Sequence, residues 1–388
     1  MASKFQTNKV ALISVTHFVH DVYTSFLAPV LPLLIDKLGL SLSMVGLLDV
    51  VRKIPSLFNP LIGIMADRIC IKYLIILAPA ASTIFMSLLG LAPSYFVLLI
   101  LLFFTGISSS LFHVPSPVAI KNFSGDKAGS GMSFYMLGGE LARSVGPLLI
   151  TAAVSWWGFE GSYKVMPLGI LASALLYYKL RDLKDIVRQK KKTKLEEETS
   201  ISVKSLIPLF IFMGAFILFR SAMKSALTLY LPIYLTSKGE SLWWAGISLS
   251  VFQFAGAMGT LGAGIISDKI GRKNTLLISA VLSPLLMWAF INANAFWLWP
   301  ILVVTGLLLF AQGPVLLALF QDTNTKRPAF VNSIYMTINF FINALMVLLV
   351  GVSGDYIGLD LTYEISAFLA VFSIIFIYFL PRETKKIL

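Results

Sequence analysis

Charged residues are scarce in this sequence of 388 residues: they make up 13% of the chain, whereas apolar residues make up 57%. Soluble globular proteins carry about 25% charged residues, so this composition excludes an ordinary soluble enzyme. Cys70 is the only cysteine, and an internal disulfide is therefore impossible. The sequence also lacks a nucleophile–base pair, a metal-type ligand spacing and a phosphate-binding loop. We expect neither an enzyme nor a resident metal or cofactor.

Long apolar runs take the place of the missing charge, and the mean hydropathy of the chain is +0.84. A helix needs about 20 mostly apolar residues to cross the roughly 30 Å of hydrocarbon in a bilayer. Backbone polar groups in lipid must bond within their own segment, so runs of this length predict helices. Twelve such runs lie at about 10–35, 43–66, 73–91, 95–120, 129–154, 163–180, 205–235, 242–266, 274–292, 295–320, 329–353 and 361–380. The sequence predicts an all-α membrane protein with twelve transmembrane helices.

Acidic residues are few, 19 against 31 Lys and Arg, which gives a net charge of +12. With twelve spans, the face that holds both termini carries Arg68, Lys72, Lys121, Lys127, Lys269, Arg272, Lys273, Lys326 and Arg327. The opposite face carries only Lys37, Lys164 and Lys238. The positive-inside rule therefore predicts a multi-pass protein of the inner membrane with both termini in the cytoplasm. This charge favours anionic lipid headgroups as partners, and nucleic acid is an unnecessary partner.

The second half of the sequence repeats the first at an offset near 200. The matching pairs are Leu31-Pro32 with Leu231-Pro232, Gly46 with Gly246, Thr105-Gly106 with Thr305-Gly306, and Ser133-x-Tyr135-Met136 with Ser333-x-Tyr335-Met336. The repeat predicts two six-helix bundles, residues 1–180 and 205–388, joined by a cytoplasmic linker over 181–204. Pseudo-symmetric halves packed around a central cavity are typical of secondary transporters that work by alternating access.

Two similar loops follow the second and eighth runs, GIMADRICIK at 63–72 and GIISDKIGRK at 264–273. They resemble the cytoplasmic signature loops of the major facilitator superfamily, which implies the major facilitator fold. In that family the loop's acid and basic residues latch the cytoplasmic gate, so the resemblance implies gating roles for Asp67, Arg68, Asp268 and Arg272. The first loop departs from the family pattern at Cys70 and Ile71, where glycine and a basic residue are usual.

Ionisable residues inside the first run form a group on one helical face. His17, His20 and Asp21 have the spacing i, i+3, i+4 and lie near the middle of the membrane. Such residues are costly in lipid and mark functional sites. A carboxylate beside imidazoles can exchange protons, so we expect a proton-coupling site here, with a purely structural hydrogen-bonded cluster as the alternative.

Two further runs carry the charges that we expect to bind substrate. Glu140 and Arg143 lie one turn apart in the fifth run, where Glu140 can take a proton when substrate engages Arg143, or the pair can be a permanent strut. Arg220 and Lys224 share one face of the seventh run without an acid in that helix. Two cations without a local partner favour an anionic or zwitterionic substrate, although Lys224 can also extend to the membrane surface.

The second and fourth runs supply the remaining candidates. Asp49, Arg52 and Lys53 can pair at i+3 and i+4 and are expected in an outer gate or in a structural pair. His113, before Val114-Pro115, can line the cavity and contact substrate, or can simply bond a neighbour.

Three segments resemble one branch of the superfamily, the fosmidomycin-resistance proteins and their relatives: THFVHD, FTGISSSLFHVPSPVAIK and FYMLGGELARSVGPLL. This resemblance implies proton-driven export (antiport) of a small antibiotic-like compound, powered by the proton-motive force without a cofactor. His20 and Glu140 depart from the neutral residues of that branch, which changes the charge of the expected cavity. The alternatives are an uptake symporter for an organic anion or sugar-like metabolite, and a membrane sensor or scaffold that transports nothing. We expect a monomer.

Overall fold

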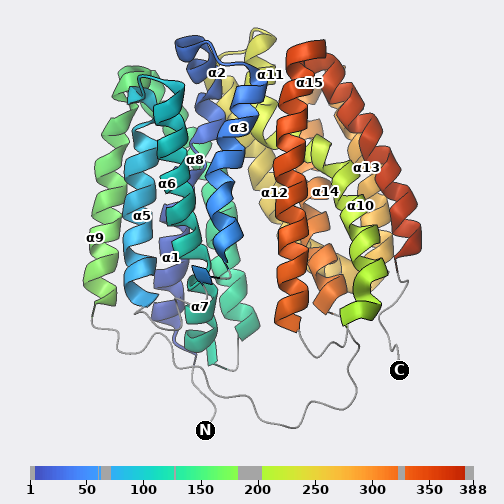
Figure 1. Ribbon diagram of the computed structural model, residues 1–388, viewed down its shortest axis with the longest axis horizontal. Helices are drawn as coiled ribbons and strands as arrows, with labels where there is room; N and C mark the ends of the chain where they lie inside the picture. The colour runs from blue at the N-terminus through green and yellow to red at the C-terminus, as the bar shows by residue number, and fades with distance from the viewer. Residues whose placement is uncertain are drawn as a thin grey trace. The chain divides into compact units, whose positions relative to one another are not determined.

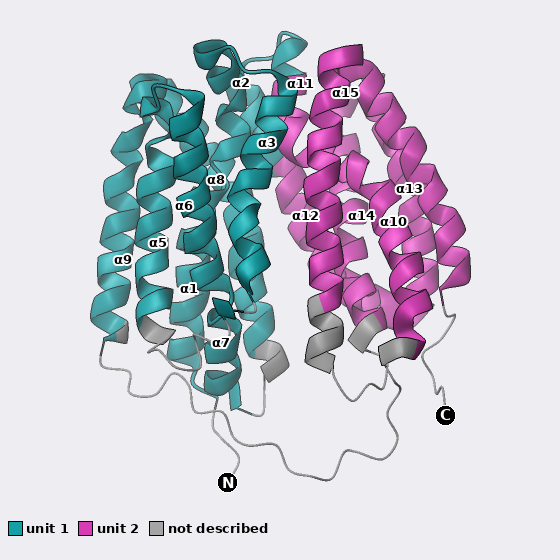
Figure 2. Ribbon diagram, in the orientation of Figure 1, with its two compact units in different colours: residues 1–190, 235–250 teal, residues 191–234, 251–388 magenta. Residues whose placement is uncertain are grey.

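The computed structural model describes residues 5–59, 61–62, 71–125, 128–181, 203–321 and 328–380, and the elements in these ranges are helices (Figure 1). The chain divides into two compact units: unit 1 comprises residues 1–190 and 235–250, and unit 2 comprises residues 191–234 and 251–388 (Figure 2). Most of the expected linker, residues 182–202, lies outside the described residues. The division at 181–204 therefore stays a prediction.

Unit 1 is built from α1 (Thr7–Thr24), α2 (Leu27–Leu38), α3 (Leu42–Lys53), the 3₁₀ helix η1 (Ile54–Phe58), α5 (Ile71–Ser87), α6 (Tyr95–His113), α7 (Ser116–Ser124), α8 (Ala128–Gly161) and α9 (Met166–Leu180). Unit 2 contains α10 (Ile207–Ser225), the π-helix η6 (Ala226–Tyr230), α13 (Arg272–Ile291), α14 (Ala295–Gln321) and α15 (Pro328–Phe379). Two helices, α11 (Leu231–Ser237) and α12 (Leu242–Ile270), contribute residues to both units. Short 3₁₀ turns at 89–91, 162–165 and 203–206 complete the described elements.

Eight helical stretches among the described residues are long and apolar enough to cross a membrane, judged by length and composition alone. They are Thr7–Leu38, Tyr73–Leu91, Tyr95–Ser124, Ile207–Ser237, Leu242–Ile270, Arg272–Ile291, Phe296–Leu319 and Ile334–Phe379. The last of these contains two helices, because the backbone leaves helical geometry at Gly358. Outside this set, α9 has only 15 residues and α3 has 12. An all-helical membrane protein is confirmed, and the number twelve stays a prediction.

The repeat in the sequence recurs in the backbone. Gly39 and Gly239 have φ values of 63° and 91°, and Gly158 and Gly358 have φ values of 73° and 78°. Left-handed backbone of this kind favours glycine, since a side chain there is strained. Both pairs are separated by 200 positions, so the two halves of the chain turn at equivalent points.

Close helix packing repeats in the same way. A Cβ atom at Gly106 of α6 would lie 2.0 Å from the carbonyl oxygen of Arg52, and one at Gly306 of α14 would lie 2.5 Å from that of Phe252. Both glycines and both carbonyls are 200 positions apart. Glycine is required at these positions because the neighbouring backbones approach too closely for a side chain, as small residues commonly allow between membrane helices.

Prolines explain why the first long span of each half is interrupted. α1 ends at Thr24, and Pro29 in the first turn of α2 lacks the N–H that would bond the carbonyl of Ser25 between the two helices. In the second half, Pro232 is the second residue of α11, and its missing N–H removes the usual i+4 donor for the carbonyl of Thr228 in the π-helix η6. Tyr363 donates a hydrogen bond of 2.7 Å to the carbonyl of Ala226 in η6, which satisfies one backbone acceptor of this irregular turn.

The exposed surface is rich in large apolar side chains. Trp156 and Phe296 are 73% and 75% exposed, and both lie close to the ends of their helices. Soluble monomers rarely expose such wide apolar surface, whereas lipid-facing surfaces need it. Aromatic residues near helix ends are typical of the membrane–water interface.

Candidate functional site

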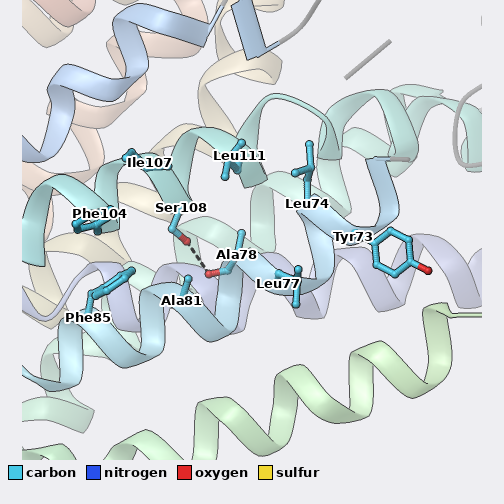
Figure 3. Close-up of a pocket in the computed structure, with 10 residues that line it drawn as sticks. All are labelled: Tyr73, Leu74, Leu77, Ala78, Ala81, Phe85, Phe104, Ile107, Ser108 and Leu111. Carbon is cyan, nitrogen blue, oxygen red and sulfur yellow. Dashed lines mark hydrogen bonds between the residues drawn. The ribbon is translucent and has the colours of Figure 1, made fainter. Parts of the chain in front are cut away.

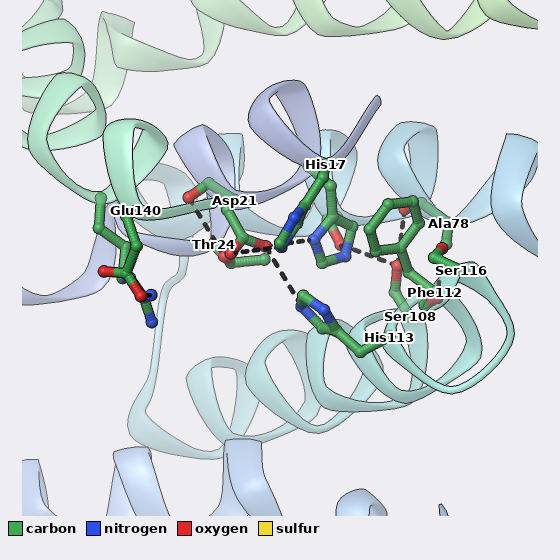
Figure 4. A network of polar contacts seen from close by, with 12 residues as sticks. His17, Asp21, Thr24, Ala78, Ser108, Phe112, His113, Ser116 and Glu140 are labelled. Atoms are coloured by element: carbon green, nitrogen blue, oxygen red, sulfur yellow. Dashed lines mark hydrogen bonds and ion pairs between the residues drawn. The ribbon is translucent and has the colours of Figure 1, made fainter. Parts of the chain in front are cut away.

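A buried cluster in unit 1 contains Asp21 and all three histidines of the chain (Figure 4). His17, His20 and Asp21 lie on adjacent turns of α1, and His113 is the last residue of α6. The carboxylate oxygens of Asp21 lie 2.8 Å from His20 Nδ1, 3.2 Å from His17 Nε2 and 3.2 Å from His113 Nε2. The predicted grouping on α1 is present, and His113 joins it from another helix.

The backbone of α8 fixes which nitrogen of His17 carries a proton. His17 Nδ1 lies 2.7 Å from the carbonyl oxygen of Tyr135, which can only accept, so Nδ1 must donate. The other nitrogen, Nε2, is buried and makes no hydrogen bond among the described residues, although it lies 3.2 Å from Asp21 Oδ2. A lone pair or a second proton of His17 therefore faces the aspartate.

A chain of hydroxyl groups extends from the other side of His20. His20 Nε2 lies 3.0 Å from Ser82 Oγ, which lies 2.8 Å from Ser108 Oγ, and Ser108 donates to the carbonyl of Ala78 at 2.6 Å. If all three contacts are hydrogen bonds, Ser108 donates to Ala78, Ser82 donates to Ser108 and His20 Nε2 donates to Ser82. A neutral His20 would then carry its single proton on Nε2, and neither Nδ1 nor the carboxylate oxygen Asp21 Oδ1, 2.8 Å away, would have a hydrogen to donate. A hydrogen bond between these two atoms needs a further proton. The connectivity therefore favours one additional proton shared by His20 and Asp21.

Aromatic stacking and a glycine on the neighbouring helix hold the cluster in place. The His17 ring stacks on Tyr135 with centroids 4.0 Å apart, and the His20 ring stacks on Phe112 at 4.6 Å. A Cβ atom at Gly139 of α8 would lie 2.4 Å from His17 Cε1. Stacking restricts both imidazoles to one orientation, and glycine at 139 leaves the space that His17 occupies.

The predicted pair on α8 is also formed. Arg143 donates to Glu140 Oε1, three residues earlier on the same helix. Glu140 is buried, and its Oε2 has no hydrogen-bond partner among the described residues, whereas the Arg143 side chain is 42% exposed. The pair is therefore only partly bonded among the described residues, with one buried carboxylate oxygen unbonded and a partly exposed guanidinium.

The charged residues on α3 are paired more completely than Glu140 and Arg143. Asp49, which is buried, accepts from Arg52 Nη2 and Lys53 Nζ, both at 2.6 Å, as the i+3 and i+4 spacing predicts. Arg52 Nη1 also donates to the carbonyl of Thr24 at 2.9 Å, at the end of α1. This places a positive charge at a helix C-terminus, where the helix dipole favours it. Arg52 thereby links α3 to the helix that carries Asp21.

Unit 2 contains a second buried polar group around Arg220 of α10. Arg220 Nη1 lies 3.3 Å from Gln312 Oε1 of α14, and Gln312 Nε2 donates to Ser279 Oγ of α13 at 2.8 Å. Among the described residues no carboxylate pairs with Arg220, and its buried Nε has no hydrogen-bond partner. Lys224, one turn further along α10, lies 5.2 Å from the ring centre of Phe310. A buried cation without a carboxylate is suited to an anionic ligand.

The two buried groups occupy equivalent positions of the repeat. His20 contacts Phe112 in unit 1, and Arg220 contacts Gln312 in unit 2, each position being 200 residues later. Tyr135 packs on His17, and Tyr335, which is 200 residues later, lies close enough to Arg220 to interact with its charge. Equivalent positions therefore hold an acid with imidazoles in one half and, in the other, a cation that no carboxylate of the described residues pairs with.

The second signature loop has its expected ion pair. Arg272 Nη1 lies 2.6 Å from Asp268 Oδ1 and also donates to Ser267 Oγ, across the junction of α12 and α13. Gly271 between these helices has a φ of 91°, which explains glycine at that position of the motif. Asp67 and Arg68 of the first loop lie outside the described residues.

Residues of α5 and α6 line an apolar groove of about 200 Å³ (Figure 3). Leu77 and Phe104 on its rim are 60% and 45% exposed, and Ser108, which belongs to the hydroxyl chain, also lines it. Large apolar side chains that are exposed on membrane helices are suited to contact with lipid. The groove therefore lies next to the polar cluster through Ser108, and the residues that line it are uncharged.

Several residues of these clusters were not predicted from the sequence. Each of them lies on a different helix from the cluster residue that it contacts: Ser82, Ser108, Tyr135, Gly139 and Gln312. Only the repeat carried a signal for one of them, because Tyr135 matches Tyr335. Serines in apolar helices are otherwise too common to single out.

The family description of the Major Facilitator Superfamily matches residues 13–345 and 250–387 of the chain. The chain belongs to this superfamily of membrane transporters, and it is not an enzyme. The superfamily that the two loops resembled is thereby confirmed.

Among curated relatives, the chain is 25% identical to the fosmidomycin resistance protein of Escherichia coli (strain K12), covering 96% of this chain and 93% of that protein. It is 24% identical to the uncharacterized MFS-type transporter YfnC of Bacillus subtilis (strain 168), covering 96% and 93%. It is also 24% identical to the multi-drug resistance efflux pump PmrA of Streptococcus pneumoniae, covering 72% of each. The branch that the sequence motifs resembled is among these relatives.

Solved structures share the fold at low identity. A bacterial homologue of the human lysosomal transporter Spinster superposes with a TM-score of 0.80 at 15% identity, covering 98% of each chain. The D-xylose–proton symporter superposes with a TM-score of 0.76 at 16% identity, also covering 98% of each chain. At this identity the likeness establishes the major facilitator fold alone.

Proposed function

We propose that this chain is a proton-coupled exporter that exchanges protons for a small anionic or amphipathic compound, such as an antibiotic, across the inner membrane. The observation that carries the proposal is the contrast between its two buried groups. Asp21, Glu140 and Arg220 are only 6%, 7% and 3% exposed, so none of these charged residues is turned toward lipid. Unit 1 holds acids that can take up protons, and unit 2 holds a cation with no carboxylate partner among the described residues.

Proton coupling is assigned to Asp21, Glu140, His17 and His20. The hydrogen-bond count around His20 favours a shared proton, and Asp21 contacts three imidazoles that can stabilise its ionised form. Glu140 keeps one buried oxygen unbonded, so protonation there costs no hydrogen bond among the described residues. Uptake and release of a proton by these two acids is the coupling step that we propose.

Substrate binding is assigned to Arg143, Arg220, Lys224 and His113. Guanidinium groups bind phosphonate and carboxylate oxygens through paired hydrogen bonds. Arg220 Nε has no hydrogen-bond partner among the described residues, and the partly exposed guanidinium of Arg143 would be held less tightly by Glu140 once that carboxylate is protonated. The side chain of His113 is 37% exposed and touches Asp21, so substrate that contacts it would sense the protonation of the aspartate.

Transport itself would proceed by alternating access. Asp268 and Arg272, together with Asp67 and Arg68, are proposed to latch the cytoplasmic gate. Asp49 and Arg52 are proposed as outer gate residues, and the bond from Arg52 to Thr24 would transmit a movement of α3 to α1. We further propose that the protein is a monomer with both termini in the cytoplasm.

The direction of transport rests on the relatives. Two of them have names that state resistance or efflux, and one of these covers 96% of this chain. An uptake symporter for an organic anion or sugar-like metabolite would use the same residues, because relative state energies of a few kcal/mol decide the direction. The fold is equally compatible with it, since the D-xylose–proton symporter superposes well.

Everted vesicles separate the two functions. A thermal-shift screen of the purified chain, starting with fosmidomycin and extending to phosphonates, organic acids and antibiotics, first selects a compound that raises the melting temperature. Ligand at about 100 times its Kd contributes about 2.7 kcal/mol of stability. The selected compound should then accumulate when the vesicle lumen is acidic, as antiport requires. Accumulation only with an alkaline lumen would establish the symporter, and a chain that no compound stabilises or that moves none would favour the sensor or scaffold.

A further inference from the structure

The cluster around Asp21 offers three metal-ligand atoms to one point in space. His17, Asp21 and His113 can each contribute one atom, and these atoms all lie within 4.8 Å of one another. The sequence spacing did not indicate such a set, because His113 comes from a different helix. Two imidazole nitrogens and a carboxylate oxygen are ligands that zinc and similar divalent ions prefer.

We propose that His17 Nε2, a carboxylate oxygen of Asp21 and His113 Nε2 form a binding site for a divalent transition-metal ion of the zinc type. This inference goes beyond the proposed transport function and does not depend on it. The set has three protein ligands, so a tetrahedral ion would keep a fourth position open for water or an anionic ligand.

The distances fit such an ion. Bonds of about 2.0–2.1 Å to a tetrahedral ion place neighbouring ligand atoms about 3.4 Å apart. His17 Nε2 lies 3.2 Å from Asp21 Oδ2, and His113 Nε2 lies 3.2 Å from Asp21 Oδ1, so each imidazole is close to that separation from one of the two carboxylate oxygens. One ligand atom from each of the three residues lies within 4.8 Å of the other two, and His113, whose side chain is 37% exposed, is the least buried of the three.

The surrounding bonds orient the ligands as metal sites require. Metal-binding histidines commonly donate their other N–H to a carbonyl or carboxylate, which fixes the tautomer. His17 does so through Nδ1 to the Tyr135 carbonyl at 2.7 Å, which leaves its buried Nε2 directed at the cluster without a hydrogen bond among the described residues. His20 bonds the carboxylate of Asp21 at 2.8 Å and can hold it in place. His20 itself is directed toward Ser82 and belongs to this outer layer.

The protein offers an unusually clean background for a test, since its only histidines are the three of this cluster and its only cysteine is Cys70. The full-length chain, purified in detergent through a tag without histidine, would be titrated with Co²⁺. Visible absorption of the bound ion and equilibrium dialysis both report binding, and Zn²⁺ should displace it. We expect one equivalent per chain.

Substitutions identify the ligands. His17→Gln, Asp21→Asn and His113→Gln should each lower the Co²⁺ affinity by more than about 100-fold, which exceeds the typical effect of an outer-layer residue. Glu140→Gln is the matched control, because it removes a buried carboxylate of the same unit that lies outside the set. Thermal unfolding checks that each variant is folded. Absence of stoichiometric binding by the unaltered chain, or equal binding by folded Asp21→Asn and His113→Gln variants, would overturn the proposal.

Discussion

Position 139 determines, at the scale of single residues, whether the cluster in unit 1 can form. A methyl group there would lie 2.4 Å from His17 Cε1 and 3.1 Å from Asp21 Oδ2. Neither ring nor carboxylate can yield easily, because His17 is stacked on Tyr135 and bonded to its carbonyl. Glycine is therefore needed here for the geometry of the site and not for backbone flexibility.

Gly139→Ala should therefore lower both stability and transport. Overpacking of this kind costs about 1–3 kcal/mol, which outweighs the gain of about 1 kcal/mol from replacing glycine in a helix. Thermal unfolding and substrate uptake by vesicles measure the two effects. Gly262→Ala in α12 is the matched control, since only Ile266 Cδ1 lies near its added methyl group, at 3.9 Å. Equal behaviour of the two variants would contradict the tight packing at 139.

In unit 2, Arg220 is the residue that we expect to bind an anionic substrate. Arg220→Gln keeps a polar side chain beside Gln312 and removes the positive charge, so an anionic compound should lose most of its stabilising effect in the thermal-shift assay. Charge-assisted hydrogen bonds contribute about 1.5–3 kcal/mol, which corresponds to a loss of affinity of at least about tenfold. Arg220→Lys should not restore binding fully, because an ammonium lacks the planar fork of the guanidinium. Undiminished stabilisation of Arg220→Gln by the anion would exclude Arg220 as its partner.

At the scale of helices, a hydroxyl group from α15 bonds a backbone carbonyl of the π-helix in the seventh span. Tyr363 is fully buried and donates to the carbonyl of Ala226 within the π-helix. Tyr363→Phe leaves that acceptor without this donor, and an unsatisfied buried polar group costs about 1–3 kcal/mol. We expect a lower melting temperature than that of Tyr356→Phe, whose side chain is 85% exposed. Identical melting temperatures would mean that water or another group satisfies the carbonyl.

The junction of α12 and α13 should affect transport more than stability. Asp268 is 66% exposed in its side chain, and exposed ion pairs contribute only about 0–1 kcal/mol. Arg272→Gln should therefore leave the melting temperature nearly unchanged and alter the transport rate, because a latch acts on the balance between conformations. Lys269→Gln removes a charge from the same turn and serves as the control. A transport rate of Arg272→Gln equal to that of the control would argue against a latch.

At the scale of the whole molecule, the sequence was informative where physics acts locally or repeats. Apolar runs predicted membrane helices, helical spacing predicted the pairs on α1, α3 and α8, and the offset of 200 reappeared in the glycines of both halves. The meeting of His113 with Asp21 and of Arg220 with Gln312 was not predictable, because helix spacing says nothing about which helices become neighbours. Loop residues Asp67 and Arg68 lie outside the described residues, so their role stays a prediction.

The most direct measurement compares two modes of transport in everted vesicles that contain the unaltered chain, Asp21→Asn or Glu140→Gln. Accumulation driven by an acidic lumen requires a proton to bind and leave, whereas exchange of labelled for unlabelled substrate across the membrane does not. If Asp21 and Glu140 couple the proton, each variant should lose gradient-driven accumulation and retain some exchange. If both variants accumulate substrate against its gradient as well as the unaltered chain does, these carboxylates are not the coupling groups.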